Sequence, residues 1–242
     1  MDGLIHLNGK IIIPVRNEEE SIPHVIRDIQ GLNLINDRSI IVVDNGSTDK
    51  TASVLEEFEI TYLFEPEKGY GNACKKALDY ISSLENKPEW IIFMDGDRSD
   101  FAGDIPVLLH YFKTQNADFI TGDRTGFPGI NSGLQDIQRF GNTLICYLLN
   151  LISGVRFRDL GPLRLIRYNH LVDLNLKDRS WGWNLEMNIK AIHKNLKILE
   201  VPVRYRNRYS GKSKISGDWK MILPVGFKIL ITFMKHTKNK KF

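Results

Sequence analysis

The sequence predicts an α/β protein built on an open, mostly parallel β-sheet with helices on both faces. Short runs of β-branched and aromatic residues recur through the first hundred positions without polar alternation. Strands that are apolar on both sides are typical of parallel sheets covered by two helix layers. Segments with helical periodicity separate these runs, and this alternation indicates consecutive β-α-β units and a doubly wound, Rossmann-like sheet.

Each element of this prediction rests on its own pattern. The expected strands, which are short and rich in Ile, Val or aromatic residues, are 11–15, 40–44, 60–64 and 90–95. The expected helices, in which apolar residues recur every three or four positions, are 18–29, 48–58 and 72–84. Ser47 or Thr48 is the expected N-cap of the second helix, because a hydroxyl at that position accepts a backbone N–H.

Length and composition indicate one globular domain. The 242 residues are 42% hydrophobic and 26% charged, which is enough for a full core. We expect this domain to cover residues 1–217 and a basic amphipathic helix with a tail to cover residues 218–242. The net charge of +4 is modest and argues against a general nucleic-acid-binding protein. No feature of the sequence specifies an oligomeric state.

Cysteine usage and hydropathy predict a cytoplasmic protein. Cys74 and Cys146 match no metal-binding or redox spacing, which favours a reducing compartment. The first ten residues lack the apolar core of a signal peptide. No stretch reaches the ~18 uncharged apolar residues expected of a membrane-spanning helix.

Acidic side chains follow the expected strands at their carboxyl ends. Asp95, Gly96 and Asp97 close the strand at 90–95, and Asp44 closes the strand at 40–44. Ligands of open α/β sheets bind at this edge, so one crevice should collect these residues. Two carboxylates one residue apart suit Mg²⁺ or Mn²⁺, which bind through carboxylates together with substrate phosphates. The spacing alone is equally typical of a turn with a solvated Asp pair.

Two further segments reach the same edge. Asp44 can accept a hydrogen bond from a nucleobase N–H, although the turn residues behind it also fit a purely structural role. Lys68 and Gly71 precede the helix at 72–84, where glycines allow the backbone to approach a phosphate closely. A lone Gly-x-Gly is a weak signal.

Four segments in this order, 14–19, 43–49, 69–73 and 95–97, resemble the family 2 inverting glycosyltransferases with the GT-A fold. Three later segments, 159–164, 183–187 and 201–214, are similar to the polyprenol-phosphate sugar synthases, the group that includes dolichol-phosphate mannose synthase. The resemblance covers residues 10–217. It implies that Asp95 and Asp97 bridge the diphosphate of a UDP- or GDP-sugar through Mg²⁺ or Mn²⁺.

The resemblance also implies that Asp44 and the segment 14–18 hold the nucleoside. With the cations considered next, the expected nucleotide-sugar-binding residues are Pro14, Val15, Asn17, Glu18, Asp44, Lys68, Gly71, Asp95, Gly96, Asp97, Arg208 and Lys212.

A basic segment near the end of the domain has two interpretations. Arg204, Arg206, Arg208, Lys212 and Lys214 occur with no acid between them. They fit a solvated charge run that protects a sheet edge. They also fit a lid, hinged at Gly211, that neutralises a diphosphate as it departs.

The loop expected at 121–133, rich in glycine, can order over a substrate. Arg124 within it, with Arg139 and Thr143 one turn apart on the next helix, can form an anion pocket. The resemblance places an acceptor phosphate there.

The nature of the acceptor decides whether the enzyme needs a base. A phosphate oxygen is already ionised, whereas a hydroxyl needs a carboxylate to take its proton. Asp159 and Glu186 are available, and the apolar surroundings of Glu186 would raise its pKa. A helical Glu that caps the helix or pairs with a nearby Arg fits the same pattern. The neighbouring Trp181 and Trp183 are either core residues or a platform for a sugar.

Residues 219–242 contain six lysines and no acid around an apolar stretch. This pattern predicts an interfacial helix that meets anionic lipid headgroups, although a core helix with a frayed tail also fits. Together these features predict a metal-dependent inverting hexosyltransferase acting on a polyprenyl phosphate at the cytoplasmic membrane face. The alternatives are transfer to a hydroxyl of a lipid or glycan, and a non-catalytic nucleotide-sugar-binding protein.

Overall fold

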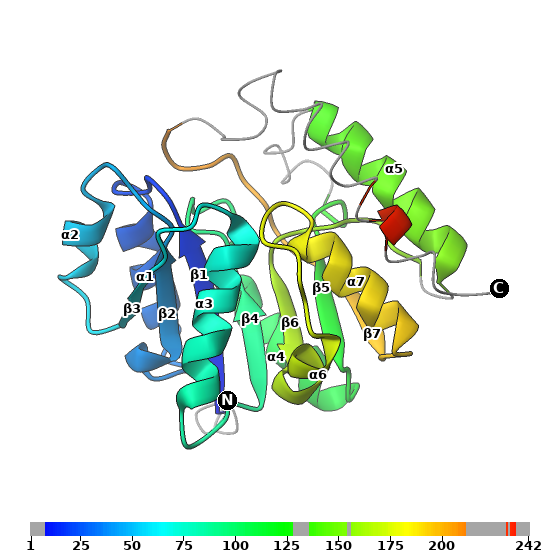
Figure 1. Ribbon diagram of the computed structural model, residues 1–242, viewed down its shortest axis with the longest axis horizontal. Coiled ribbons are helices and arrows are strands. Elements are labelled where there is room, and N and C mark those ends of the chain that lie inside the picture. The colour runs from blue at the N-terminus through cyan, green and yellow to red at the C-terminus, as the bar shows by residue number, and fades with distance from the viewer. Residues whose placement is uncertain (1–7, 128–135, 154–155, 212–230, 232, 236–242) are drawn as a thin grey trace.

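The computed structural model describes residues 8–127, 136–153, 156–211, 231 and 233–235. A single mixed sheet runs through its centre, and helices lie against both faces (Figure 1). The expected domain boundary at 217 and nearly all of the expected C-terminal helix lie outside the described residues. Within these residues, no helix combines the length and the apolar character needed to cross a membrane.

The described part of the chain forms a seven-stranded sheet with the order β3-β2-β1-β4-β6-β5-β7. Its strands are β1 (Gly9–Val15), β2 (Ile40–Asp44), β3 (Thr61–Phe64), β4 (Trp90–Phe93), β5 (Phe119–Asp123), β6 (Arg164–Arg167) and β7 (Ile198–Pro202). Strand β6 is antiparallel to both of its neighbours, and all other pairs are parallel. The predicted open, mostly parallel sheet is therefore confirmed.

Helices connect these strands and cover the sheet. They are α1 (Ile22–Gln30), α2 (Thr51–Leu55), α3 (Tyr70–Ser83), α4 (Ile105–Thr114), α5 (Asp136–Ile152), α6 (Tyr168–Leu174) and α7 (Trp183–His193), with the short 3-10 turns η1 (Asp37–Ser39) and η2 (Ala102–Asp104). One core joins α1 and α4 to one face of the sheet, and a second core joins α3, α5, α6 and α7 to the other. Strand β1 shows the division, because Ile11 and Ile13 enter the first core and Ile12 enters the second.

The structure corrects two local predictions. Helix α2 begins at Thr51, so neither Ser47 nor Thr48 is its N-cap. Both residues bond to Asn17 instead: the Ser47 hydroxyl accepts from the Asn17 N–H at 2.9 Å, and the Thr48 N–H donates to Asn17 Oδ1 at 2.8 Å. The expected loop at 121–133 starts later than predicted, since residues 121–123 belong to β5. Arg124 therefore follows directly on a buried strand.

Candidate active site

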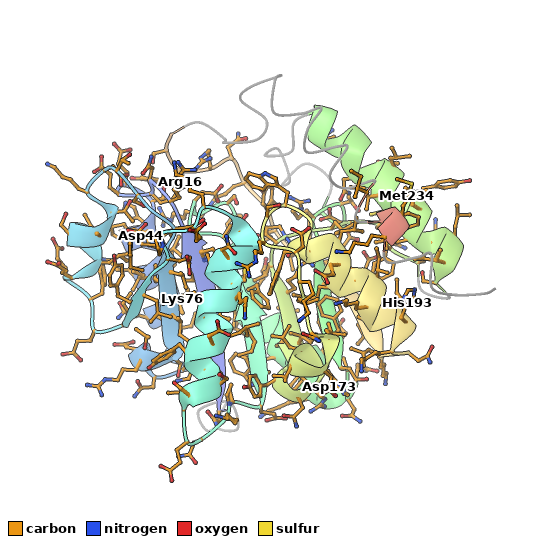
Figure 2. The ribbon with its side chains drawn as sticks, in the orientation of Figure 1. Arg16, Asp44, Lys76, Asp173, His193 and Met234 are labelled. Carbon is orange, nitrogen blue, oxygen red and sulfur yellow. The ribbon has the colours of Figure 1, made fainter. Side chains whose placement is uncertain are left out.

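The carboxyl ends of β1, β2, β4 and β5 border a cavity of about 520 Å³. This volume lies in the range of small-molecule sites. Figure 2 shows Arg16, which follows β1, and Asp44, which ends β2, at the same end of the sheet. The residues that line the cavity are Pro14, Val15, Arg16, Glu18, Asn45, Lys68, Gly69, Tyr70, Ala73, Asp95, Gly96, Asp97, Arg124, Leu160, Pro162, Ser180, Trp181, Asn184, Tyr205 and Arg208.

The two aspartates after β4 lie in this cavity, as the sequence predicted. Asp97 Oδ1 accepts hydrogen bonds from the Ser99 N–H at 2.9 Å and the Ser99 hydroxyl at 2.5 Å. The Asp95 N–H donates to Asp100 Oδ2 at 3.1 Å, which fixes the backbone between the aspartates and the buried Asp100. These bonds hold the Asp-Gly-Asp turn in one conformation and leave Asp97 Oδ2 without a partner in the described part of the chain.

This cluster carries more negative charge than its surroundings neutralise. Burial, followed by the charges of Asp100 and Asp97, raises the pKa of Asp95 well above its ordinary value. Burial also raises the pKa of Asp100 to about 7. Within the described residues none of the three aspartates forms an ion pair with Lys, Arg or His, and Asp100 Oδ1 has no hydrogen-bond partner.

A hard divalent cation fits this donor set. Three uncompensated carboxylates favour a positive ion, and oxygen ligands suit Mg²⁺ or Mn²⁺. In the described part of the chain no three acidic, His or Cys side chains converge on one point. Asp95 and Asp97 would therefore supply part of a coordination shell, with substrate oxygens supplying the remainder.

At the end of β5, Arg124 is held by Asp159. Arg124 Nε and Nη2 donate to the two carboxylate oxygens of Asp159 at 2.7 and 2.8 Å, and the Arg124 N–H donates to Oδ2 at 2.9 Å. The Tyr205 ring lies 4.8 Å from the guanidinium carbon. The Asp159 side chain is buried and does not line the cavity, whereas Arg124 does. The Asp159 carboxylate therefore orients the Arg124 guanidinium.

Glu186, the second predicted base, also lies outside the cavity lining. Its carboxylate accepts from the N–H of Lys177 at 3.0 Å and of Asp178 at 2.6 Å, and it pairs with Lys190 Nζ at 2.7 Å. The alternative offered by the sequence was helix capping or an ion pair with an arginine; the structure shows an ion pair with a lysine instead. Glu186 fastens the start of the segment 177–181 to α7, and Ser180 and Trp181 at the end of that segment line the cavity.

Replacing Glu186 with Gln is expected to cost stability and to leave chemistry nearly unchanged. The amide removes the charge that pairs with Lys190 and places a donor against backbone N–H groups, a loss of about 1–3 kcal/mol in free energy of unfolding. Denaturant unfolding and the turnover of the folded fraction measure the two effects separately. A turnover reduced a hundredfold at unchanged stability would instead identify Glu186 as a base.

The basic segment is anchored by acids over the part that the structure describes. Arg204 binds Asp104 through both its backbone N–H and its guanidinium, with distances of 2.7 to 2.9 Å. Arg206 Nε donates to the Arg98 carbonyl at 2.7 Å. Both guanidinium groups are therefore structural.

Arg208 alone among these three arginines lines the cavity, where its Nη2 donates to Glu18 Oε1 at 2.6 Å. The Tyr209 N–H donates to the Asp97 carbonyl at 3.0 Å, so the segment also braces the Asp-Gly-Asp turn. Lys212 and Lys214 lie outside the described residues.

The glycine loop before α3 is organised by protein contacts. Asn45 donates to the carbonyls of Glu65 and Glu67 at 3.0 and 2.7 Å and accepts from the Gly69 N–H at 2.7 Å. A Cβ on Gly71 would collide with the backbone of Asp178. Gly71 thus permits close packing of the segment 177–180 and does not line the cavity, while Lys68 and Gly69 do.

Two residues predicted to hold the nucleoside, Asp44 and Asn17, are not among the residues that line the cavity. Asp44 is buried and accepts from the Ser47 N–H at 2.9 Å. Asn17 adopts a left-handed conformation with φ of 53° and bonds to the turn at Ser47 and Thr48. These contacts organise the loops after β1 and β2.

The three residues predicted to form the acceptor pocket do not all line the cavity. Arg124 lines the cavity, whereas Arg139 and Thr143 are exposed on α5 and do not. They lie one turn apart, as predicted, and the Thr143 hydroxyl donates to the Arg139 carbonyl at 2.8 Å.

Two cavity residues were not singled out by the sequence, although Arg16 lies within the expected nucleoside-binding segment 14–18 and Asn184 within the segment 183–187. Arg16 Nε and Asn184 Oδ1 are buried there without a hydrogen-bond partner in the described part of the chain, so one donor and one acceptor are available to a ligand. The two tryptophans separate: Trp183 is a core residue and Trp181 lines the cavity. In the sequence, Arg16 and Asn184 are neighbours of expected site residues. Only the direction of their side chains, which the structure gives, distinguishes them from residues that point into solvent.

Comparison with known proteins identifies the group to which these features belong. The family described as Glycosyl transferase family 2 matches residues 10–172. An uncharacterized glycosyltransferase of Mycobacterium bovis is 32% identical over 208 residues, which cover 86% of this chain and 89% of the relative. Glycosyltransferase AglJ of Haloferax volcanii is 29% identical over 204 residues, covering 83% of this chain and 64% of AglJ.

Solved structures share the fold. The glucosyl-3-phosphoglycerate synthase of Mycobacterium tuberculosis, crystallised with Mn²⁺, UDP and phosphoglyceric acid, aligns with a TM-score of 0.71 at 18% identity. The alignment covers 98% of this chain and 80% of the synthase. At this identity the likeness shows the fold alone, and it supports the predicted GT-A architecture.

Proposed function

This chain belongs to glycosyl transferase family 2, and we propose that it transfers a hexose from a UDP- or GDP-sugar to a polyprenyl phosphate. The proposed reaction inverts the anomeric centre and uses Mg²⁺ or Mn²⁺. The phosphate acceptor rests on one observation: Arg124 lines the cavity with its guanidinium fixed by Asp159, whereas neither expected base lines it.

The acids that line the cavity favour an acceptor that is already ionised. They are Glu18, Asp95 and Asp97 in the described part of the chain. Glu18 is bound to Arg208, and the two aspartates belong to the metal-binding turn. A hydroxyl acceptor would need a free carboxylate near the reacting carbon. A phosphate oxygen needs only to be held and oriented, and a fixed guanidinium does this well.

In the proposed reaction, the cavity residues would have the following roles. Asp95 and Asp97 would hold the metal, which when bound neutralises the diphosphate and stabilises it as a leaving group. Lys68 and Arg208 add positive charge at the cavity wall, where the departing diphosphate develops its own charge. Arg124 would orient the acceptor phosphate toward the anomeric carbon, while Arg16 Nε and Asn184 Oδ1 offer hydrogen bonds to the donor.

The related fold gives independent support for the ligand classes. The Mycobacterium synthase was crystallised with a divalent metal, a nucleoside diphosphate and a phosphate-bearing acid. A metal, a nucleotide sugar and a phosphorylated acceptor are therefore compatible with this architecture. The step from a phosphorylated acid to a lipid phosphate is the proposal of this section.

A matched pair of acceptors tests the proposal. The protein is incubated with Mn²⁺, a panel of UDP- and GDP-hexoses, and either a short polyprenyl phosphate or the corresponding polyprenol. We expect nucleoside diphosphate release and a glycolipid only with the phosphate, and NMR should show an inverted anomeric centre. Equal transfer to the polyprenol would establish the hydroxyl alternative. Metal-dependent nucleotide binding without transfer to any acceptor would indicate a non-catalytic protein.

A further inference from the structure

Glu200 of β7 binds the backbone of the segment that carries Asp159. Its Oε1 and Oε2 atoms each accept from the Arg158 N–H at 2.9 Å, and Oε1 also accepts from the Asp159 N–H at 3.1 Å. Hydrogen bonds from backbone N–H groups to a carboxylate are charge-assisted and stronger than bonds to a neutral acceptor. Glu200 therefore holds the two consecutive peptide units that lead into Asp159.

This contact is one residue away from the cavity wall. The Asp159 carboxylate accepts from the Arg124 N–H at 2.9 Å and from Nε and Nη2 of the same residue at 2.7 and 2.8 Å. Arg124 lines the cavity, whereas neither Asp159 nor Glu200 does. Strand β7 pairs with β5 in parallel register, with Glu200 opposite Thr121, so Glu200 is attached to the strand that Arg124 follows. We call the chain of contacts from Glu200 through Asp159 to Arg124 the Glu200 relay.

The neighbouring residues of the same segment are held by uncharged side chains. Asn150 of α5 accepts from the Phe157 N–H at 2.6 Å, and Asn142 Oδ1 accepts from the Leu160 N–H at 2.9 Å. Neutral amides keep the same hydrogen bonds at any pH in the physiological range. Glu200 performs the corresponding task for the residues between them with a group that can take up a proton.

Glu200 lies among acids. Asp123 on β5 and Asp159 both act on it, and the Arg158 guanidinium lies 3.9 Å from Asp123 Oδ2. Burial, together with these two carboxylates, raises the pKa of Glu200 to about 7, although the bonds from the N–H groups act in the opposite direction. After burial and Asp159, the charge of Glu200 also raises the pKa of the Cys146 thiol on α5, so that thiol stays uncharged. Glu200 therefore changes its charge near neutral pH.

We propose that Glu200 is a positioning residue for the acceptor phosphate and acts through the Asp159 carboxylate on the Arg124 guanidinium. The inference rests on the proposed function, because it concerns the acceptor that Arg124 would bind. When the Glu200 carboxyl takes up a proton, one of its oxygens becomes an O–H donor and no longer suits the N–H groups that it faces. The backbone of 158–159 then loses part of its support, and the guanidinium is held less firmly for the acceptor.

Steady-state kinetics of the full chain with Glu200→Gln tests the relay. The amide keeps the size of the side chain, but it removes the charge and can turn its NH₂ group toward the N–H groups of the segment. At about pH 8 we expect the KM for polyprenyl phosphate to rise about tenfold and the KM for the nucleotide sugar to stay unchanged. Glu200→Ala removes the carboxylate without adding a donor, and it should show the same split even if the Gln variant does not fold.

Glu186→Gln is the matched control. Its carboxylate accepts from two consecutive N–H groups in the same way, those of Lys177 and Asp178 at 3.0 and 2.6 Å, but on the segment that leads to Trp181. A general loss of rigidity would appear as a lower melting temperature in both variants. The KM for polyprenyl phosphate should rise in the Glu200 variants and stay at the wild-type value in Glu186→Gln.

The pH profile gives a second measurement. The KM of the wild type for the acceptor should rise between about pH 8 and about pH 6, partly because the acceptor phosphate itself takes up a proton. Every variant shares that part, so the difference between the wild type and Glu200→Gln isolates Glu200. We expect this difference to be about tenfold at the upper end of the range and to disappear at the lower end.

Unfolding does not explain such a profile. Because folding raises the pKa of Glu200, the stability that this group contributes is fully present below the ordinary pKa of a glutamate and is lost as pH rises through about 7. Lowering the pH therefore does not destabilise the fold through Glu200. Thermal unfolding at both ends of the range should confirm that the wild type and the variants remain folded.

A triple variant locates the path of the effect. Glu200→Gln is added to the double variant Arg124→Gln with Asp159→Asn, in which both charges of the pair are removed. We expect the KM for polyprenyl phosphate to equal that of the double variant, because the groups through which Glu200 acts are no longer present.

Four outcomes would overturn the relay. An acceptor KM at the wild-type value in both Glu200 variants would do so, as would a rise that persists in full in the triple variant. Equal rises of both KM values would show that Glu200 only supports the fold. In these three cases, transfer to polyprenyl phosphate by the wild type leaves the proposed function standing. Transfer by the wild type to the polyprenol alone would remove the proposed function, and with it the acceptor phosphate that Glu200 would position.

Discussion

Replacing Asp97 with Asn is expected to reduce sugar transfer by about two to three orders of magnitude while the protein stays folded. The amide can keep the Oδ1 bonds to the Ser99 N–H and hydroxyl, so the turn after β4 retains its geometry. It removes the negative charge, and a neutral oxygen is a weaker ligand for Mg²⁺ or Mn²⁺. Turnover against metal concentration, together with thermal unfolding, measures both consequences.

The structure supplies a second expectation for this variant. The charge of Asp97 contributes to the raised pKa of Asp95, after burial and Asp100. Removing it relieves repulsion in the absence of metal, so the metal-free variant should be at least as stable as the metal-free wild type. Asp79→Asn on the exposed side of α3 serves as the charge-matched control, with no change in turnover. Full activity of Asp97→Asn, or of the wild type in excess chelator, would remove the metal from the proposed reaction.

Backbone organisation was largely predictable because it depends on local pattern. Strand β2 was predicted with its observed bounds, and α3 within two residues. Burial on both sides of β2, β4 and β5 favours apolar runs, which can be recognised in the sequence without tertiary information. The first residue of α2 was not predictable from the sequence, because Ser47 and Thr48 bond to Asn17, which lies thirty and thirty-one positions earlier in the chain.

The sequence predicted at which strand ends the site residues lie, but not in which direction their side chains point. Asp95, Asp97 and Glu18 line the cavity as expected, since they follow strands whose ends meet there. Asp159 and Glu186 could not be assigned, because an acid in an apolar stretch fits both a base and an ion pair. Their partners in the structure favour the ion pair: Arg124 lies 35 positions from Asp159, and Lys190 lies one helical turn from Glu186.

Arg164 illustrates a role that only the packed structure reveals. It is fully buried and lies within the segment that resembles the lipid-phosphate synthases. Its guanidinium donates to the carbonyls of Gly161 and Asn184 and forms no salt bridge with an acid among the described residues. Burial lowers the pKa of Arg164 to about 10. It fixes two walls of the cavity from behind, a function that its place in the sequence does not disclose.

Substitutions at Arg124 and Asp159 are expected to separate stability from transfer. Arg124→Gln alone leaves the Asp159 carboxylate buried without its cation, and Asp159→Asn alone leaves the guanidinium without its anion; each should cost about 3–5 kcal/mol in free energy of unfolding. The double variant Arg124→Gln with Asp159→Asn removes both charges, and its two amides can bond to each other. Its stability should therefore recover most of the loss.

Transfer should not recover in that double variant, because the cavity no longer holds a fixed cation for the acceptor phosphate. We expect turnover to fall by about a hundredfold or more, with a raised KM for the polyprenyl phosphate and an unchanged KM for the nucleotide sugar. Denaturant unfolding of the four proteins gives the coupling energy of the pair, and steady-state kinetics with each substrate varied gives the two KM values. If transfer returns together with stability, the pair acts only on the fold, and the acceptor phosphate must bind elsewhere. If it stays lost while nucleotide binding is intact, Arg124 is the residue that recognises the acceptor, and Asp159 is the residue that positions it.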